Sequence, residues 1–206
     1  MAIEKQINVP AIIISEIKSL GNNPAITNYL ECRGIALDTA RPYCKEVYYQ
    51  LDNKQYFTAG FENRSGGYEL RNLYFKGSSS PKDITHIQNG SKSVCVLEGF
   101  IDFLSLLTLQ KSIHPIRSDF LILNSVSMAE KSLDTLKVYR NVFLYLDLDS
   151  AGRKTQEKYQ SAGLKTVDAS GIYENFKDIN DYLMDQKLSR KEVQQQAVKK
   201  SGRMHL

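Results

Sequence analysis

The sequence predicts an α/β fold, in which a parallel sheet flanked by helices follows a small N-terminal α+β subdomain. Apolar runs short enough to be strands buried on both faces occur in the C-terminal part at 94–97, 119–123, 141–146 and 164–168. Helical segments lie between them at 100–111, 127–138 and 151–162. Repeated strand–helix units of this kind predict parallel strands joined by right-handed crossovers. The N-terminal part instead carries Tyr- and Phe-rich runs typical of hairpin strands.

The N-terminal part is expected to hold two short helices and then strands. In NPAITNYLECRG, Asn23 is the expected N-cap, Pro24 the first helical residue and Gly34 the terminator. Asp38 takes the capping position of LDTARPYCKEV. VYYQLDNKQYFTAGFEN places strand-forming runs on both sides of an Asp-Asn turn, which predicts a hairpin. The alternation in GGYELRNLYFKG predicts a further strand.

Three parts of the chain follow from this pattern. Residues 76–93 are rich in Gly, Ser, Asn and Lys and poor in apolar side chains, which indicates a linker or a long connection. We expect the small α+β subdomain at 1–90, the parallel-sheet domain at 91–186, and a basic helix or tail at 187–206. This tail carries a net charge of +5 while the rest of the chain sums to −1, and a basic tail is more often a solvated end than a binding element.

Composition and motifs exclude several classes of protein. The chain is 42% hydrophobic and 24% charged, as in ordinary globular proteins. No apolar run approaches the ~20 residues that span a bilayer, and the N-terminal stretch lacks the features of a signal peptide. We therefore expect a cytoplasmic protein without a membrane partner. The three cysteines, Cys32, Cys44 and Cys95, form neither a disulfide framework nor a zinc-binding pattern.

Carboxylates follow two of the predicted strands. Glu98 comes directly after VCVL, Asp147 comes directly after VFLYL, and Asp149 lies two residues further on. Ligands of parallel α/β sheets bind beyond the carboxyl ends of the strands, so these acids converge if the two strands are neighbours. Like charges at such a rim destabilise one another unless a cation lies between them. A hard divalent cation is the natural counter-ion, and Mg²⁺ is favoured.

Each acidic motif also has a structural interpretation. In LDLDSAG, Asp149 or Ser150 could cap the helix at 151–162, and Glu-Gly is a common exit from a strand. Taken singly, each motif favours that interpretation. The occurrence of both motifs in one strand–helix series favours a functional site.

These motifs resemble the two signatures of the Toprim domain, strand–E-G-x-x-D–helix and strand–D-x-D-x-A-G–helix. VLEGFIDFLSL and LYLDLDSAGRKT match them in order, and FKDINDYL looks like the ending found in the bacterial DNA primase branch. YLECRGIALDTARPY is similar to the segment that opens the primase catalytic core. The resemblance covers about residues 92–186 and implies a Toprim-like sheet.

The resemblance implies roles for six acids. The catalytic residues are expected to be Glu98, Asp147 and Asp149. These three, together with Asp178, are the expected ligands of Mg²⁺, with Mn²⁺ as a substitute. Asp102 and Asp181 are expected to orient or support the ligands, and Asp102 is also a candidate helix cap.

Basic side chains are candidates for contacts to phosphate. AGFENRSGGYELRNLYFKGSSSPKDIT is similar to a region of primases that turns back toward the active site, and a helix N-terminus after Asp149 favours anions. The candidates are Arg64, Arg71, Lys76, Lys82, Arg153 and Lys154. For Arg71, Lys76 and Lys82 taken singly, an exposed charge on an edge or a linker is at least as good an explanation, and Arg64 with Arg71 around the Gly-Gly is the best pair.

The expected function is Mg²⁺-dependent nucleotidyl or phosphoryl transfer on nucleic acid, as in primer synthesis for DNA replication or mobile-element transfer. The expected partners are single-stranded DNA template and nucleotides. The chain shows no cysteine pattern for the zinc ribbon of replicative primases and no room for the tyrosine-bearing domain of topoisomerases. A separate zinc-binding or helicase partner is therefore a further expectation. A Mg²⁺-dependent Toprim nuclease and a non-catalytic nucleic-acid-binding accessory protein are the alternatives.

Overall fold

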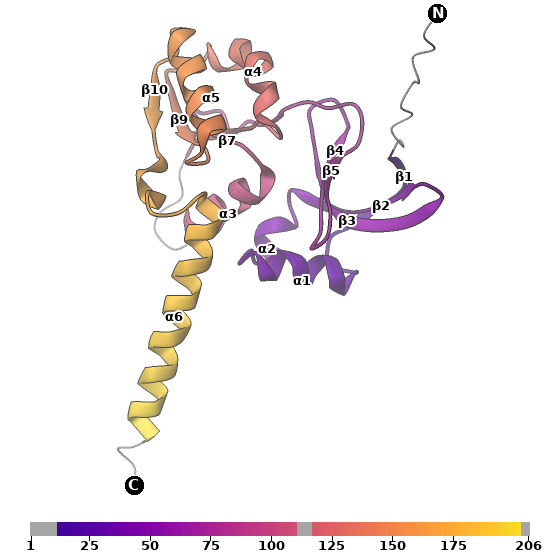
Figure 1. The fold of residues 1–206 in the computed structure, drawn as a ribbon, viewed down its shortest axis with the longest axis vertical. Coiled ribbons are helices and arrows are strands. Elements are labelled where there is room, and N and C mark those ends of the chain that lie inside the picture. Colours follow the sequence, from indigo (N-terminus) through magenta and orange to yellow (C-terminus); the bar gives the residue numbers. More distant parts are fainter. Residues whose placement is uncertain (1–11, 111–116, 203–206) are drawn as a thin grey trace, which may run out of the picture.

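The computed structural model describes residues 12–110 and 117–202, and it contains two five-stranded sheets (Figure 1). The first sheet is antiparallel and the second is mainly parallel with helices packed around it. The predicted α/β fold with a small N-terminal α+β unit is therefore confirmed. None of the helices in the described ranges is long and apolar enough to cross a membrane.

The first sheet has the strand order β1-β2-β3-β4-β5. Its strands are β1 (Ile13–Ser19), β2 (Cys44–Leu51), β3 (Lys54–Glu62), β4 (Tyr68–Arg71) and β5 (Lys76–Ser78). The predicted hairpin is confirmed at the β2–β3 turn, where Asp52 and Asn53 have φ values of 50° and 61°, as a tight primed turn requires. The expected strand over GGYELRNLYFKG ends early at Arg71, because Asn72–Phe75 form a turn closed by the Asn72 N–H and the Phe75 carbonyl at 3.0 Å.

Two helices, α1 (Pro24–Cys32) and α2 (Leu37–Ala40), pack against this sheet and the neighbouring domain. The expected start and end of α1 are confirmed, since the Asn23 side chain accepts a hydrogen bond from the Ala25 N–H at 3.0 Å. Gly34 follows the helix with φ 72°, in the left-handed region that favours glycine. The expectation for Asp38 is wrong. Ala36 occupies the cap of α2, and Asp38 lies in its first turn.

The second sheet has the order β10-β9-β7-β8-β6. Its strands are β6 (Thr85–Ile87), β7 (Ser93–Leu97), β8 (Asp119–Ile122), β9 (Asn141–Tyr145) and β10 (Thr166–Asp168). The predicted parallel arrangement is confirmed for β7 to β10, whereas β6 runs antiparallel to β8. The segment 76–93 is thus more than a linker, because it contributes β5 to one sheet and β6 to the other. Both strands have only three residues, too few to show an alternating pattern.

The helices of the second unit are α3 (Phe100–Gln110), α4 (Ala129–Leu136), α5 (Ser150–Ser161) and α6 (Ile179–Gly202), with short 3-10 turns η1 (Val126–Met128) and η2 (Ser170–Tyr173). The helix expected only in the C-terminal tail begins earlier, so that α6 runs directly from the FKDINDYL motif. Figure 1 shows α6 leading away from the body of the protein. Its first turns contact α3 and η2.

The two sheets share one hydrophobic core. Phe61 of the first sheet stacks on Phe100 of α3 at a centroid distance of 5.2 Å, and Phe103 contacts Phe120 of β8 at 5.1 Å. The same cluster includes Ile26 and Leu30 of α1, both fully buried. Aromatic contacts of this kind bury large apolar areas. The first sheet is therefore packed rigidly against the start of α3, which is where the acidic motifs lie.

Candidate active site

Strands β7 and β9 bring the two acidic motifs together. The strands are hydrogen-bonded neighbours, with Leu97 opposite Tyr145. One residue beyond β7, the Glu98 Oε1 atom accepts a hydrogen bond from the Asp147 N–H at 3.1 Å. The two strands end at the same rim of the sheet, as the sequence predicted.

Two helix starts add further carboxylates to this rim. Asp102, in the first turn of α3, accepts a hydrogen bond from the Gly99 N–H at 3.1 Å, so it does cap its own helix. Asp178 directly precedes α6 and accepts from the Asp181 N–H at 2.8 Å. The Leu148 N–H donates to the Lys177 carbonyl at 2.8 Å, which holds this segment beside the end of β9.

Asp102, Asp147 and Asp178 form a carboxylate cluster. Each offers one oxygen, and these three oxygens all lie within 4.8 Å of one another. Asp149 is not part of the cluster, because its Oδ1 atom accepts from the Ala151 and Gly152 N–H groups at 2.8 and 3.0 Å and caps α5. Asp181 contributes its backbone N–H to Asp178, and the Asp181 residue itself is exposed.

The packing around the cluster requires a glycine in α5. A Cβ atom at Gly152 would lie 2.1 Å from the Asp147 carbonyl oxygen and 3.1 Å from Glu98 Oε1. The first distance is far below van der Waals contact. The glycine of LDLDSAG thus allows α5 to approach the acidic rim closely.

The electrostatics of the rim reflect crowded negative charge. Burial and the nearby Asp147 raise the pKa of Glu98 to about 7. Burial and Asp178 raise the pKa of Asp147 to about 6. The pKa of Asp102 lies well above its usual range, because of burial and then Asp147 and Asp178. None of the ion pairs within residues 12–110 and 117–202 involves these carboxylates. Oxygen donors that repel one another in this way suit a hard divalent cation.

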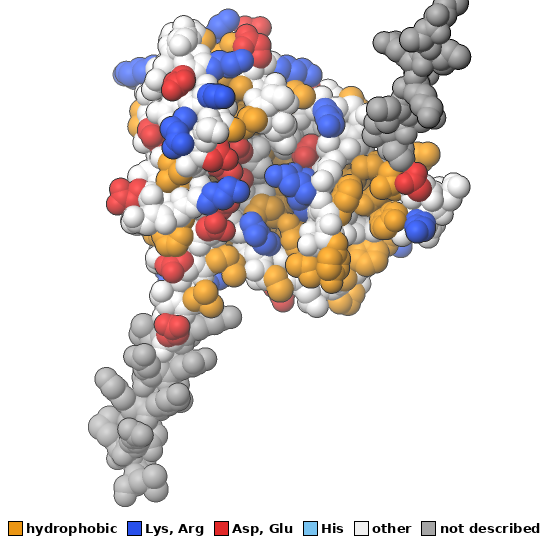
Figure 2. Space-filling model, in the orientation of Figure 1, with side chains coloured by type: hydrophobic (Ala, Val, Ile, Leu, Met, Phe, Trp, Pro, Cys, Tyr) orange, Lys and Arg blue, Asp and Glu red, His pale blue; other side chains and the backbone are white. Residues whose placement is uncertain are grey.

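A cavity of about 650 Å³ opens beside the cluster, between the two sheets. Asp102, Asp147 and Asp178 line one side. The turn between β4 and β5, and the end of α1, line the other. Four cationic side chains border this cavity: Arg33, Arg71, Lys76 and Lys177. Figure 2 shows acidic and basic side chains side by side near the centre of the visible face. The cavity therefore combines a cation site with groups that attract phosphate.

Arg71 is held rigidly in this cavity. Its Nη1 atom donates to the carbonyls of Leu70 and Gly77 at 2.9 and 3.0 Å, and its guanidinium lies over the Phe100 ring at 5.8 Å. Burial lowers its pKa from the ordinary value, and Glu69, 3.6 Å from Nη2, opposes this shift. A guanidinium fixed in this way is well oriented for a phosphate.

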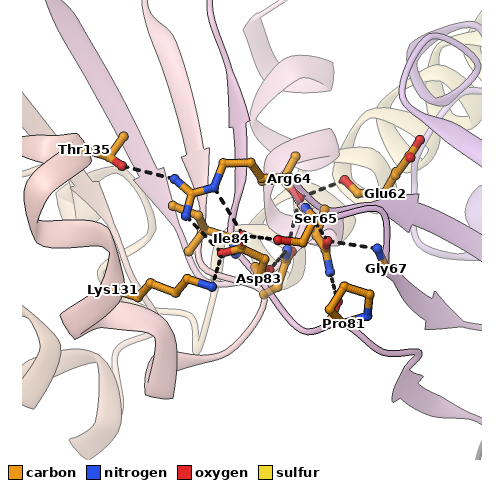
Figure 3. Close-up of polar contacts among 12 residues, drawn as sticks. Glu62, Arg64, Ser65, Gly67, Pro81, Asp83, Ile84, Lys131 and Thr135 are labelled. Atoms are coloured by element: carbon orange, nitrogen blue, oxygen red, sulfur yellow. Dashed lines mark hydrogen bonds and ion pairs between the residues drawn. The ribbon is translucent and has the colours of Figure 1, made fainter.

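Four of the predicted phosphate-binding residues lie outside this cavity. Arg64 does not line the cavity and pairs with Asp83 through Nε and Nη2, both at 3.2 Å (Figure 3). Lys82 lines a separate small cavity together with Glu69 and Ser78. Arg153 and Lys154 are exposed near the start of α5. The structure thus places two of the six predicted basic residues, Arg71 and Lys76, in the cavity.

Sequence reasoning missed Arg33 and Lys177. Both belong to motifs that had been recognised, YLECRG and FKDINDYL, but only the neighbouring residues had been considered. Their approach to the acids depends on the packing of α1 and α6 against α3. Their position within recognised motifs was the available signal.

Comparison with known proteins agrees with this geometry. Residues 95–183 match a family described as Toprim-like, and residues 14–80 match a domain of unknown function (DUF8464). A DNA helicase/primase of Enterobacteria phage T3 is 26% identical over 159 residues, which cover 69% of this chain. Residues 95–183 thus form a Toprim-like domain. The chain spans only 27% of the length of that curated relative.

Solved primase structures share the fold of this chain. The primase fragment of the bacteriophage T7 primase-helicase aligns with a TM-score of 0.57 and 23% identity, covering 82% of this chain and 73% of that one. The Aquifex aeolicus primase, with its zinc-binding and RNA polymerase domains, aligns with a TM-score of 0.58 and 16% identity, covering 84% of this chain and 56% of that one. At these identities the likeness establishes the fold.

Proposed function

We propose that this chain is a metal-dependent nucleotidyltransferase that extends a nucleic-acid strand on a single-stranded DNA template. The observation that carries the proposal is that the carboxylate cluster and four cationic side chains line one cavity. Nucleotidyl transfer requires neutralisation of phosphate charge and alignment of the reacting oxygens, and this arrangement can supply both. One structurally similar complex contains primase domains bound to an RNA/DNA hybrid and dTTP, which supports the proposal.

Asp102, Asp147 and Asp178 are the proposed holders of a divalent cation, Mg²⁺ or Mn²⁺, with Glu98 beside them. Their oxygens are hard donors, and the repulsion between these closely spaced carboxylates favours the binding of a cation. When bound, the cation would supply Lewis-acid stabilisation of phosphate charge. Asp149 is proposed to act indirectly, by fixing the start of α5 beside this cluster.

The cationic side chains of the cavity are proposed to bind the substrate. Arg71 and Lys76, from either end of the β4–β5 turn, and Lys177, next to Asp178, are proposed to bind nucleotide or template phosphate. Arg33, at the C-cap of α1, opposes the rise in the pKa of Asp102 that burial and the neighbouring carboxylates cause, so it lies within electrostatic reach of the cluster. Glu98 is proposed either to ligate the cation or to accept the proton of the attacking hydroxyl.

Template-directed incorporation of labelled nucleotides tests this function. Asp147→Asn is expected to reduce incorporation by about 100-fold or more, because a charge-stabilising group of the transition state is lost. Asp185→Asn, an exposed acid on α6 outside the cavity, is the matched control and is expected to keep normal activity. Circular dichroism verifies that both variants are folded.

A titration of Mn²⁺ followed by calorimetry provides an independent readout. The wild-type chain is expected to bind Mn²⁺, and Asp147→Asn is expected to bind it at least ~10-fold more weakly. Absence of Mn²⁺ uptake by the wild-type chain would contradict the proposal. Shortening of labelled DNA in place of extension would assign the same acids to a nuclease. A separate zinc-binding or helicase partner, supplied in the assay, tests whether primer synthesis needs one.

A further inference from the structure

Large apolar side chains project from the mouth of the cavity. Leu73 and Tyr74, in the turn between β4 and β5, are 69% and 90% exposed. Both also line the cavity, together with Tyr29 of α1. Exposure of apolar residues at a cavity mouth is costly unless a ligand covers them.

These residues continue into a wider apolar surface. The Asn72 side chain donates to the Phe57 carbonyl at 2.9 Å and accepts from the Tyr74 N–H at 2.9 Å, which places the turn beside β3. Phe57 is itself 40% exposed and packs on Tyr48 at a centroid distance of 6.3 Å. Figure 2 shows hydrophobic side chains gathered over β1 to β3 and α1. We name Tyr29, Phe57, Leu73 and Tyr74 the apolar shelf.

The apolar shelf and the phosphate-binding groups belong to the same hairpin. Arg71 and Lys76 flank Leu73 and Tyr74 in sequence, and all four line the cavity. Surfaces that bind single-stranded nucleic acid combine these two features, cations for the backbone and aromatic rings for stacked bases. An apolar surface that binds a protein does not need cationic side chains beside it in a cavity, so the combination favours nucleic acid over a protein partner.

We propose that the apolar shelf binds the bases of a single nucleic-acid strand as it enters the cavity. Tyr74 stacks on a base, and Leu73 and Phe57 cover the neighbouring one. Stacking requires unpaired base faces, so the shelf selects single-stranded over duplex nucleic acid and tolerates any sequence. This inference rests on the proposed function and specifies how its template is held.

Binding of a fluorescein-labelled single-stranded oligonucleotide of mixed sequence, followed by anisotropy, tests the shelf. Tyr74→Ala is expected to weaken binding roughly 5- to 100-fold, the range found for one lost base–aromatic stack. Tyr74→Phe is expected to restore binding, because the ring remains. Val138→Ala removes an 80% exposed side chain outside the cavity and is expected to bind as the wild type does.

The salt dependence separates stacking from phosphate contact. Tyr74→Ala should leave the slope of log K against log salt concentration unchanged, whereas Lys76→Gln should reduce it by about one. The proposed role of the apolar shelf would be overturned if the wild type and Tyr74→Ala bound the oligonucleotide with equal affinity. It would also be overturned if the wild type did not bind the oligonucleotide. The wild-type chain could fail to incorporate nucleotides while Tyr74→Ala still shows the expected weakening of oligonucleotide binding. That result would support the proposed role of the apolar shelf and refute the proposed nucleotidyltransferase function.

Discussion

Single carboxylates in this chain behave differently according to the donors around them. Asp149 faces two backbone N–H groups, which hold its pKa below the ordinary value. The pKa of Asp102 is raised by burial first and then by two other carboxylates, and Asp102 has only one such donor. Sequence spacing favoured Asp149 as the cation ligand, while side-chain geometry groups Asp102 with Asp147 and Asp178. The difference arises because two backbone N–H donors satisfy the Asp149 carboxylate, whereas Asp102 and Asp178 each accept from one.

Glu46 shows the same effect outside the site. Its Oε1 atom accepts hydrogen bonds from the N–H groups of Gly21, Asn22 and Asn23, at 3.0, 2.6 and 2.7 Å, and the residue is fully buried. Burial raises its pKa, but these N–H donors, with Asn23 the strongest, outweigh burial and hold the pKa below the ordinary value. This carboxylate therefore pins the turn that precedes α1.

We predict that Glu46→Gln destabilises the fold by about 1–3 kcal/mol at pH 7, because charge-assisted hydrogen bonds to a buried group are weakened. The folded-state pKa is depressed, so the stabilisation by Glu46 is present above the unfolded pKa of ~4.5 and is lost as the pH falls through the folded pKa. Urea denaturation at pH 7 and at pH 3 should show the two proteins converging at the lower pH. Glu31→Gln, an exposed acid on α1, should differ from wild type by less than ~0.5 kcal/mol at both values.

At the scale of elements, the acidic rim depends on how closely α5 approaches β9. Gly152 allows this approach, and Asp149 fixes the first turn of the helix. The predicted helix at 151–162 and the observed α5 agree closely, because caps and a glycine mark both ends in the sequence. The strands β5 and β6 have only three residues each, and no such boundary signals in the sequence indicated them.

We predict that Gly152→Ala destabilises the protein by about 2 kcal/mol or more and weakens Mn²⁺ binding, since the added methyl group collides with the Asp147 backbone. Gly171→Ala is the matched control, because a Cβ atom there meets nothing within 4 Å. Urea denaturation and calorimetric titration of Mn²⁺ measure the two effects. If both variants matched the wild type, close packing of α5 on β9 would not be required for the site.

At the scale of the whole molecule, the two units are joined by the shared core and by one buried carboxylate. Asp83, whose side chain is 2% exposed, pairs with Arg64 from the β3–β4 connection and with Lys131 of α4 (Figure 3). Ser65 also donates to it at 2.6 Å. Burial opposes ionisation of Asp83, but Ser65, Lys131 and Arg64 hold its pKa well below the usual range.

We predict that Asp83→Asn destabilises the protein by about 2 kcal/mol or more, because donors from both units lose their buried, charged acceptor. Lys131→Gln should cost under ~1 kcal/mol, since Lys131 is half exposed and Arg64 still neutralises the carboxylate. Asp134→Asn on the same helix, where the acid is 93% exposed, serves as the control and should change the free energy of unfolding by less than ~0.5 kcal/mol. Urea denaturation provides the comparison. Equal stability of Asp83→Asn and Asp134→Asn would show that the core alone joins the units.

The sequence by itself determined the parallel sheet, the β2–β3 hairpin, the cap of α1, and the meeting of Glu98 with Asp147. These features depend on local periodicity and on residues next to one another in the chain, whose preferences act before tertiary packing. Only the tertiary structure decided that Asp102, and not Asp149, lies with Asp147 and Asp178. It alone also decided that Arg33 and Lys177 border the cavity and that Arg64 pairs with Asp83. Those outcomes depend on how α1, α3 and α6 pack across long separations in the chain, and no local pattern encodes such distances.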